Sequence, residues 1–374
     1  MKILVTGANG FIGKNLLAVL RALRPDCRAL PVDVDSAPDA LADALATADF
    51  IFHLAGVNRP QSESEFQTGN ADLTARICNR LLELKRPVPL VLSSSVQALL
   101  DNSYGLSKRK AEETVADYVC RSGARAAVYR LKNVFGKWCR PNYNSVVATF
   151  CHNIAHDLPV TISDPERELE LVYIDDVVRH FLGNLDMAGQ GGIEYPEIEP
   201  EYKIKLSDLA ELVRSFRLMR RTLHVPDFSG EFARKLYGTY LTYLDQDDFA
   251  YDLEKKNDAR GSLAEFVKSA PFGQIFISRT KPGITRGNHC HDTKSEKFLV
   301  VEGEALIRFR HVREGGVIEY RVRGEDMRVV DIPPGYVHSI ENIGAGELVT
   351  VFWAAEIFDP ARADTNALPV VPEK

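Results

Sequence analysis

A glycine-rich turn near the start of this 374-residue chain limits the folds that it can adopt. Residues 2–6 form an apolar run typical of a strand, and the stretch Thr6-Gly7-Ala8-Asn9-Gly10-Phe11-Ile12-Gly13 leads from it into a helical pattern. Gly7 permits a tight turn, and Gly10 lets the backbone approach a pyrophosphate that the free N–H groups of the helix attract. A strand, a glycine turn and a helix in this order indicate a dinucleotide site more than a structural turn.

Strand-like and helical patterns alternate through the first two thirds of the chain. We predict strands over 2–6, 50–54, 89–93 and 128–131, and helices over 13–24, 107–121 and 209–216. After about residue 245 the chain becomes a series of short β-rich runs at 274–278, 297–301, 305–310, 317–323 and 348–352. Alternation favours a doubly wound parallel sheet, and short runs between Gly and Pro turns favour a β-sandwich or small barrel. We therefore expect an α/β Rossmann-like domain over 1–245 and an all-β jelly-roll domain over 246–374.

Composition excludes several classes of partner. The net charge of −6 provides no basic footprint, so we expect no nucleic acid. No apolar run approaches the roughly 20 residues that span a membrane, and no apolar leader precedes the first strand.

The six cysteines are scattered without a CxxC pair, which suits a cytoplasmic protein with reduced thiols. The β-rich edges of the second domain lead us to expect a homodimer.

A tyrosine and a lysine four residues apart form a second signature of the first domain. Tyr104 and Lys108 share one face of a predicted helix start, so that Lys108 can lower the pKa of Tyr104 and hold a nicotinamide ribose. Ser95, with Ser94 as the alternative, ends the preceding strand at the edge where ligands bind. Asp33 lies about twenty residues beyond Gly13, where an acid takes the ribose hydroxyls of NAD; the alternative is a solvated loop acid.

These motifs resemble those of the extended short-chain dehydrogenase/reductase family that modifies sugar nucleotides. The resemblance also covers His53-Leu54-Ala55-Gly56, Asn70, Arg130 to Asn133 and Tyr173-Ile174-Asp175-Asp176. It implies that Ser95 and Tyr104 polarise a carbonyl, that Tyr104 passes the proton and that Lys108 supports Tyr104. The residues that it implies for the cofactor are Gly7, Asn9, Gly10, Phe11, Ile12, Gly13, Asp33, Leu54, Ala55, Gly56, Asn70, Tyr104 and Lys108.

The loop over residues 137–144 mixes cations, aromatic rings and amides. Lys137 and Arg140 could hold a diphosphate there, and Asn133 precedes the loop. We take Asn133, Lys137 and Arg140 as candidate substrate-binding residues; the alternative is an ordinary surface loop.

Three histidines and one glutamate predict a metal site in the second domain. His289 and His291 lie two residues apart, so on a strand both side chains leave the same face. Glu296 follows on the next run, and His338 comes after a Pro-Pro-Gly turn. This ligand set suits Zn, Fe, Mn or Ni, and we take Zn as the first choice. The spacing from Gly283 to Gly303 and the run from Pro333 to Asn342 resemble the two motifs of the cupin family.

The chain as a whole resembles the family of CapF and its O-antigen relatives, in which a short-chain reductase is fused to a cupin. The matching stretches are 54–60, 135–139 and 303–311. The family implies a UDP-2-acetamido-2,6-dideoxy-4-hexulose whose C3 is inverted by the cupin and whose C4 is reduced by the first domain. The product is UDP-N-acetyl-6-deoxy-L-talosamine, on the way to UDP-N-acetyl-L-fucosamine for capsule or O-antigen. The family uses NADPH, whereas Asp33 favours NADH, so NADH stays possible.

Two rival functions stay open from the sequence. One is a sugar-nucleotide 4-epimerase or dehydratase with a non-catalytic cupin, which the Tyr104–Lys108 pair alone does not exclude. The other is an NADP-sensing regulatory protein. The chain carries a complete set of candidate reductase residues and a complete set of candidate metal ligands. This favours the two-step enzyme, since a sensor has little need of both sets.

Overall fold

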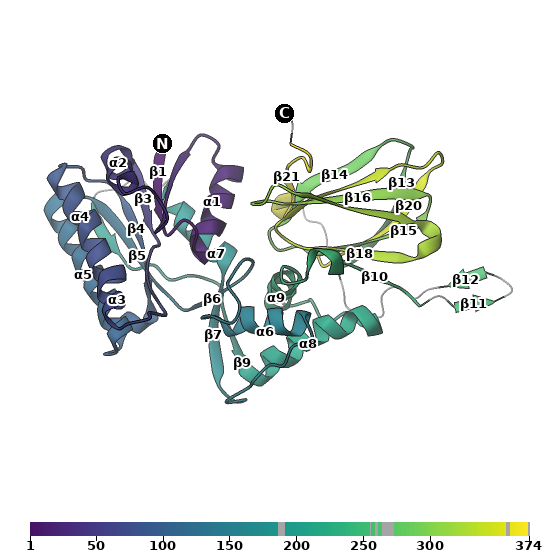
Figure 1. Ribbon diagram of the computed structural model, residues 1–374, viewed down its shortest axis with the longest axis horizontal. Coiled ribbons are helices and arrows are strands. Elements are labelled where there is room, and N and C mark those ends of the chain that lie inside the picture. Colours follow the sequence, from purple (N-terminus) through teal and green to yellow (C-terminus); the bar gives the residue numbers. More distant parts are fainter. Residues whose placement is uncertain (186–190, 255, 259–260, 264–272, 357–359, 373–374) are drawn as a thin grey trace. The chain divides into compact units, whose positions relative to one another are not determined.

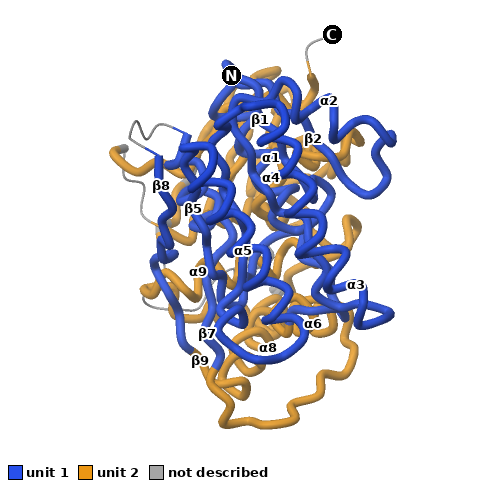
Figure 2. Tube along the Cα trace, turned by 90° about the vertical axis from the view of Figure 1, so that its left-hand side faces the viewer, with its two compact units in different colours: residues 1–145, 169–203 blue, residues 146–168, 204–374 orange. Residues whose placement is uncertain are grey.

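The computed structural model describes residues 1–185, 191–254, 256–258, 261–263, 273–356 and 360–372. Contacts divide the chain into two compact units, which Figure 2 colours separately. Unit 1 comprises 1–145 and 169–203, and unit 2 comprises 146–168 and 204–374. Among the described residues, no helix is both long and apolar enough to cross a membrane.

A six-stranded parallel sheet forms the centre of unit 1, with the order β2-β1-β3-β4-β5-β8. Its strands are β1 (Lys2–Thr6), β2 (Arg28–Val32), β3 (Phe50–His53), β4 (Leu90–Ser95), β5 (Arg125–Leu131) and β8 (Gly192–Glu194). The order reverses direction at β1, because β2 and β3 lie on its two sides. Ligands of open α/β sheets bind outside the carboxyl ends of the strands at such a point.

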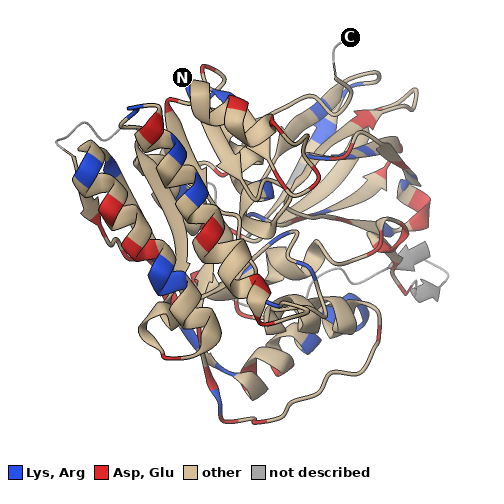
Figure 3. Cartoon of the chain, turned by 60° about the vertical axis from the view of Figure 1, so that its left-hand side comes forward, with Lys and Arg blue, Asp and Glu red and all other residues tan. Residues whose placement is uncertain are grey.

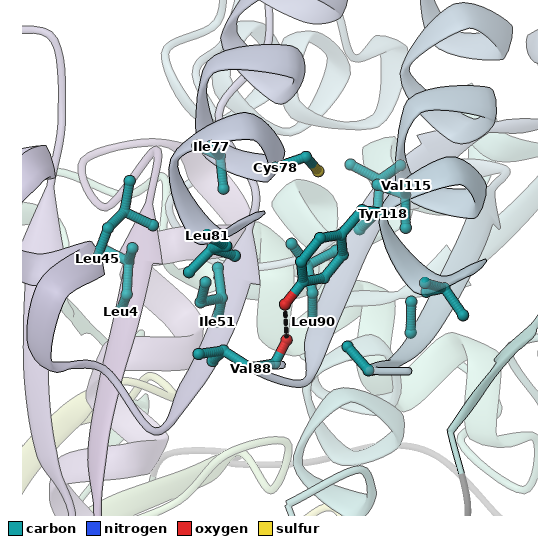
Figure 4. Close-up of a cluster of buried hydrophobic side chains, with 14 of the residues drawn as sticks. Leu4, Leu45, Ile51, Ile77, Cys78, Leu81, Val88, Leu90, Val115 and Tyr118 are labelled. Carbon is teal, nitrogen blue, oxygen red and sulfur yellow. Dashed lines mark hydrogen bonds between the residues drawn. The ribbon is translucent and has the colours of Figure 1, made fainter. Parts of the chain in front are cut away.

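Helices cover both faces of this sheet (Figure 1). They are α1 (Phe11–Leu23), α2 (Ala40–Thr47), α3 (Ser64–Phe66), α4 (Leu73–Glu83), α5 (Ser103–Ser122) and α7 (Ile174–Gly183), with η1 (Gln67–Asp72) between α3 and α4, and η2 (Val96–Leu99) before α5. Leu45, Leu81 and Val115 come from α2, α4 and α5 and belong to one buried cluster with Leu4 and Ile51 of the sheet (Figure 4). A small sheet of β6 (Asn133–Phe135), β7 (Glu168–Tyr173) and β9 (Glu201–Lys205) follows.

Two antiparallel five-stranded sheets form the jelly roll of unit 2. One has the order β10-β18-β15-β20-β13 and the other β17-β16-β19-β14-β21. The strands are β10 (Ala250–Asp252), β13 (Gln274–Thr280), β14 (Thr285–Cys290), β15 (Glu296–Glu302), β16 (Glu304–His311), β17 (Val317–Arg323), β18 (Arg328–Ile332), β19 (Tyr336–Asn342), β20 (Leu348–Ala354) and β21 (Asn366–Ala367). A separate hairpin pairs β11 (Lys256–Asp258) with β12 (Gly261–Leu263), and the short helical turns are η3 (Gln246–Asp248), η4 (Gly324–Asp326) and η5 (Pro360–Arg362). The predicted α/β and jelly-roll classes are both confirmed.

Helices that precede the jelly roll in sequence pack with it in unit 2. They are α6 (Val146–Ala155), α8 (Leu206–Thr222) and α9 (Glu231–Leu241). Before α9, Phe228 places its ring 6.0 Å from that of Trp353. In α9, Tyr237 lies beneath the ammonium of Lys297, which pairs with Asp331 in the barrel; Lys297 is 1% exposed. Lys297 and Asp331 both belong to the jelly roll, and removing one partner of such a buried pair costs about 3–5 kcal/mol. The domain boundary between 245 and 246 stays a prediction.

Basic and acidic residues are interspersed along the helices in the view of Figure 3. Several pair on the surface, such as Arg121 with Asp117 at 3.0 Å and Arg80 with Glu83 at 3.0 Å. This mixture is what the sequence predicts for a protein without a basic footprint.

Candidate active sites in the two units

The glycine turn joins β1 to α1 in the conformation that a phosphate cradle needs. Gly7 has φ +68°. Across the turn, the Gly10 N–H donates to the Gly7 carbonyl at 3.0 Å. A Cβ on Gly13 would lie 2.2 Å from that same carbonyl oxygen, so only glycine fits. Gly10 caps α1 without a side-chain hydrogen bond, which leaves the first N–H groups of the helix available to an anion.

A buried histidine ties the ends of β1 and β3 to helix α4. Thr6 Oγ1 lies 2.7 Å from Nδ1 of His53 and accepts the N–H groups of Leu54 and Ala55. On the other side, His53 Nε2 lies 2.9 Å from Thr74 Oγ1, which donates to the Asn70 carbonyl. Burial, assisted by the Lys108 charge, lowers the pKa of His53 to about 3. His53 is therefore neutral and links Thr6 to Thr74, while Thr6 Oγ1 holds the backbone N–H groups of the predicted residues Leu54 and Ala55.

Asn70 lies in the π-helical turn η1, and its amide fixes the loop after β3. Its Oδ1 accepts the Val57 N–H at 2.9 Å, while its Nδ2 donates to the Val57 carbonyl at 3.0 Å and to Ser107 Oγ at 2.9 Å. A Cβ on Gly56 would lie 2.7 Å from Asn70 Oδ1 and 3.0 Å from Lys108 Nζ. Three predicted residues, Gly56, Asn70 and Lys108, thus meet at one place. Single π-turns are often found at functional sites.

Tyr104 and Lys108 lie in the first turns of α5, beside the end of β4. Lys108 donates to the Ser93 carbonyl at 3.1 Å, and its Nζ lies 6.0 Å from the centre of the Tyr104 ring. Burial lowers the pKa of Lys108 to about 8, against the opposing Glu112 charge. Burial raises the pKa of Tyr104, and a hydrogen bond with Ser95 opposes that rise only in part. Tyr104 is therefore buried and a weaker acid than usual, and its hydroxyl forms a hydrogen bond with Ser95. The effect of Lys108 on Tyr104 stays a prediction.

The two candidate serines have different partners. Ser94 donates to Glu112 at 2.5 Å, and Glu112 accepts a bidentate pair from Arg130, with the shortest contact at 2.6 Å. Ser95 instead faces Tyr104. Because successive residues of a strand point to opposite sides, only one of them can face Tyr104, and the geometry favours Ser95.

Asp33 directly follows β2, close to the glycine turn. Its Oδ2 accepts the N–H of Asn9 at 2.7 Å, and the Asn9 amide donates to Asp35 at 3.1 Å. Two carboxylates therefore lie beside the predicted cofactor residue Asn9. Such an arrangement suits ribose hydroxyls better than an additional phosphate.

The three predicted substrate residues have different surroundings. Asn133 is exposed and donates to the Glu170 carbonyl at 3.3 Å, and Arg140 stacks over the Tyr143 ring at 5.1 Å. Lys137 is 3% exposed and pairs with buried Asp175 at 2.6 Å. The ion pair of Lys137 favours a structural role. The role of all three in substrate binding stays a prediction.

In unit 2, the four predicted metal ligands converge inside the jelly roll. One ligand atom from each of His289, His291, Glu296 and His338 lies within 4.8 Å of the others. Glu296 Oε2 is 3.4 Å from His291 Nε2 and 3.7 Å from His338 Nε2. The ligands come from the end of β14, the start of β15 and the middle of β19, so two sheets supply them.

The cluster has the chemistry of a metal site rather than of a packed core. Nε2 of His291 and Nε2 of His338 are buried and have no hydrogen-bond partner among the described residues. Burial raises the pKa of Glu296, but the neighbouring His291, with His338 and Lys294, outweighs this effect and brings the pKa down to about 2. Burial holds the pKa of His338 well below its ordinary value. Two orphaned imidazole nitrogens facing a carboxylate fit a divalent cation.

Three residues beside these ligands in sequence make packing or ion-pair contacts elsewhere in the jelly roll. Cys290 packs with Val337 and Val370, as the alternation of a strand predicts. Lys297, which follows Glu296, lies on the opposite face of β15 and pairs with Asp331. Tyr336, two residues before His338, packs its ring 5.2 Å from that of Phe249. The structure therefore places Lys297 outside the metal cluster.

Comparisons with known proteins agree with this architecture. Residues 3–195 match the NAD dependent epimerase/dehydratase family, and residues 256–366 match the polysaccharide biosynthesis C-terminal domain. Over 99% of both chains, the sequence is 44% identical to UDP-2-acetamido-2,6-beta-L-arabino-hexul-4-ose reductase from Pseudomonas aeruginosa. The crystal structure of the capsular polysaccharide assembling protein CapF from Staphylococcus aureus matches 99% of this chain and 100% of its own, with 43% identity and a TM-score of 0.68.

The chain belongs to the CapF family. Its first part also shares the fold of the UDP-glucuronic acid 4-epimerase from Bacillus cereus in complex with NAD, at 20% identity over 57% of this chain and 84% of that one, with a TM-score of 0.51. Membership of the CapF family makes the chain an enzyme with reductase and epimerase homology that uses a nicotinamide cofactor.

Proposed function

We propose that this CapF-family protein is a bifunctional sugar-nucleotide enzyme. The cupin inverts C3 of UDP-2-acetamido-2,6-dideoxy-4-hexulose, and unit 1 then reduces its C4 ketone to UDP-N-acetyl-6-deoxy-L-talosamine, on the way to UDP-N-acetyl-L-fucosamine. The observation that carries the proposal is the presence on one chain of the His289/His291/Glu296/His338 cluster and of Tyr104 with Ser95 and Lys108. The similarity to the Pseudomonas relative, a hexul-4-ose reductase, supports it.

The order of the two steps follows from the acidity of C3. The C3 proton can leave only while a C4 ketone is next to it, because the ketone accepts the negative charge. A divalent metal held by the four ligands, with zinc as the first choice, supplies Lewis-acid polarisation of that ketone, worth several kcal/mol in typical sites. Hydride delivery to C4 removes the ketone, so epimerisation must come first.

In unit 1, Ser95, Tyr104 and Lys108 have separate roles in the reduction. Ser95 and Tyr104 bind the ketone oxygen, and Tyr104 gives it a proton as hydride arrives at C4. Lys108 holds the nicotinamide ribose and restores the charge balance around Tyr104. The Ser93 carbonyl holds the Lys108 ammonium, Asn70 bonds the neighbouring Ser107, and the missing side chain of Gly56 leaves room for the ammonium.

The consumption of reductant tests this function against the nearest rival. A 4-epimerase or dehydratase returns its hydride to the product, whereas the proposed enzyme consumes one nicotinamide per product. We expect the amount of NADPH oxidised to equal the amount of 4-hydroxy product measured by NMR. Product formation without net oxidation would contradict the proposal in favour of that rival.

Gly56→Ala is expected to lower reduction more than stability. A methyl group at Gly56 would meet two movable side-chain atoms, Asn70 Oδ1 and Lys108 Nζ, so the fold can adjust while both groups shift. A shift of about 1 Å can cost roughly 10²-fold in rate. We expect kcat/KM for NADPH oxidation to fall by that order. Gly183→Ala is the control, because no atom lies within 4 Å of its added Cβ; equal losses in both variants would contradict the assignment.

NADPH is our proposed reductant, with NADH also accepted, and Asp33 sets the balance between them. Its carboxylate, held by Asn9, repels a 2′-phosphate and suits a 2′-hydroxyl. We expect Asp33→Asn to shift the ratio of kcat/KM for NADPH over NADH upward by about tenfold, a change of about 1.4 kcal/mol. The exposed Asp39→Asn is the control. An unchanged ratio in Asp33→Asn would place the ribose elsewhere.

A further inference from the structure

The loop between two metal ligands is held by a carboxylate from the C-terminal segment. Residues 292–295 join His291 to Glu296. Asp364 Oδ1 accepts the N–H of Asp292 at 2.8 Å, and Oδ2 accepts the N–H groups of Thr293 at 2.8 Å and Lys294 at 2.6 Å. Oδ2 also accepts the Thr293 hydroxyl at 2.9 Å. Three consecutive backbone donors therefore meet one side chain, which fixes the path of the loop and the spacing between His291 and Glu296.

The same residue contacts a ligand directly through its main chain. His291 Nδ1 lies 2.6 Å from the Asp364 carbonyl oxygen. A carbonyl oxygen only accepts, so Nδ1 carries the proton and Nε2 keeps its lone pair. That Nε2 is the atom which faces Glu296 Oε2 at 3.4 Å. Asp364 thus selects the tautomer of His291 that can bind a metal.

The segment that carries Asp364 is itself attached to the ligand strand. In β21, Asn366 pairs with Cys290 and Ala367 pairs with His289 of β14. Beyond it, the Leu368 N–H donates to the Asn288 carbonyl at 2.9 Å, and Arg310 donates to the Val370 carbonyl at 2.8 Å. The position of Asp364 is therefore set by backbone pairing on the same strand that ends in the ligands.

We propose that Asp364 is a positioning residue of the metal centre, which fixes the tautomer of His291 and the loop between His291 and Glu296. The inference rests on the metal site of the proposed function. Outer partners of metal-bound histidines typically change metal affinity by about 10–100-fold when they are removed. The cupin motif gives no sign of this residue, because Asp364 lies 73 positions beyond His291.

Zinc affinity tests the proposal without any turnover. The full-length chain is stripped with a chelator, and the Zn²⁺ dissociation constant is measured by competition with a chromophoric chelator for wild type, Asp364→Ala and Asp364→Asn. We expect binding to weaken by about 10–100-fold in Asp364→Ala. Both variants keep the backbone carbonyl that contacts His291. Asp364→Asn also keeps one side-chain oxygen acceptor for the loop, so it should show a smaller loss. Asp326→Ala removes an exposed acid of the same jelly roll and should bind like wild type.

Stability without metal separates positioning from general folding. The unfolding midpoints of the stripped wild type and Asp364→Asn should agree, while the rise of the midpoint on adding Zn²⁺ should be smaller in the variant. If Asp364→Ala fails to fold, Asp364→Asn decides the question by the same two measurements. A zinc affinity within twofold of wild type in a folded Asp364 variant would overturn the proposal. A wild type that binds no zinc would instead remove the metal site itself.

Discussion

His338→Ala is expected to stop the exchange of the C3 proton while leaving the reduction of an already epimerised ketone intact. His338 is 0% exposed, and its Nε2 faces Glu296 Oε2 at 3.7 Å, so the variant removes one of four ligands from the centre of the cluster. Polarisation of the ketone by the metal stabilises the transition state by several kcal/mol. Because each factor of ten in rate corresponds to about 1.4 kcal/mol, its loss predicts that the rate of C3 exchange falls by at least about 10²-fold. Exchange is measured by NMR of the sugar nucleotide in D2O.

The control for this variant is another histidine of the same jelly roll. His311 is buried, and its ring lies 5.0 Å from that of Tyr336 rather than among the ligands. His311→Gln should keep both zinc binding and C3 exchange. If His338→Ala also lost reduction of the epimerised ketone while its fold and its cofactor binding were intact, the assignment of two separate sites would be wrong.

Tyr104→Phe is expected to have the opposite effect. The variant removes the hydroxyl that interacts with Ser95, and with it the proton for the C4 oxygen. General acid catalysis contributes typically about 10²–10⁴-fold, so NADPH oxidation should fall by that factor. Exchange at C3 should continue at the wild-type rate, because the cupin ligands are unchanged. Both are followed in one sample, by absorbance of the cofactor and by NMR.

A second tyrosine of α5 provides the matched control. Tyr118 donates to the Val88 carbonyl at 2.9 Å in the core of unit 1 (Figure 4). Tyr118→Phe removes a structural hydrogen bond, which costs about 1 kcal/mol of stability, but no proton donor of the reaction. NADPH oxidation should therefore be close to wild type. Loss of C3 exchange in Tyr104→Phe would contradict the division of labour.

The two inactive variants together should regain turnover. A mixture of His338→Ala and Tyr104→Phe contains one intact site of each kind. If the epimerised ketone leaves the cupin and reaches a reductase site, NADPH oxidation returns in the mixture but not in either variant alone. The absence of recovery, with both proteins folded and the ketone stable, would argue against two independent reactions joined by a released intermediate.

Much of this architecture could be predicted because the decisive signals are local in sequence. The glycine turn, the Tyr104–Lys108 spacing and the paired histidines each lie within a few residues, and strand or helix periodicity then places their side chains. The strand predicted over 317–323 is confirmed with the same bounds, whereas the helix predicted over 209–216 extends over 206–222. Element ends depend on tertiary packing and are harder to predict.

What the sequence did not indicate depends on contacts between distant segments. The burial of Lys137 against Asp175 joins residues 38 positions apart, and no local pattern predicts it. The packing of α8 and α9 with the jelly roll is likewise non-local, since Arg220 approaches Asp331 at 3.9 Å. Strand alternation could have placed Lys297 opposite Glu296, and it could have separated the faces of Ser94 and Ser95.

The incubation of wild-type protein with the 4-keto sugar nucleotide in D2O, without any reductant, tests the central claim most directly. The His289/His291/Glu296/His338 cluster is proposed to serve the same ketone that the nicotinamide later reduces. The account predicts deuterium at C3, together with signals of the inverted sugar, and both should disappear after removal of the metal by a chelator. A sugar that keeps its C3 proton in the presence of bound metal would contradict it.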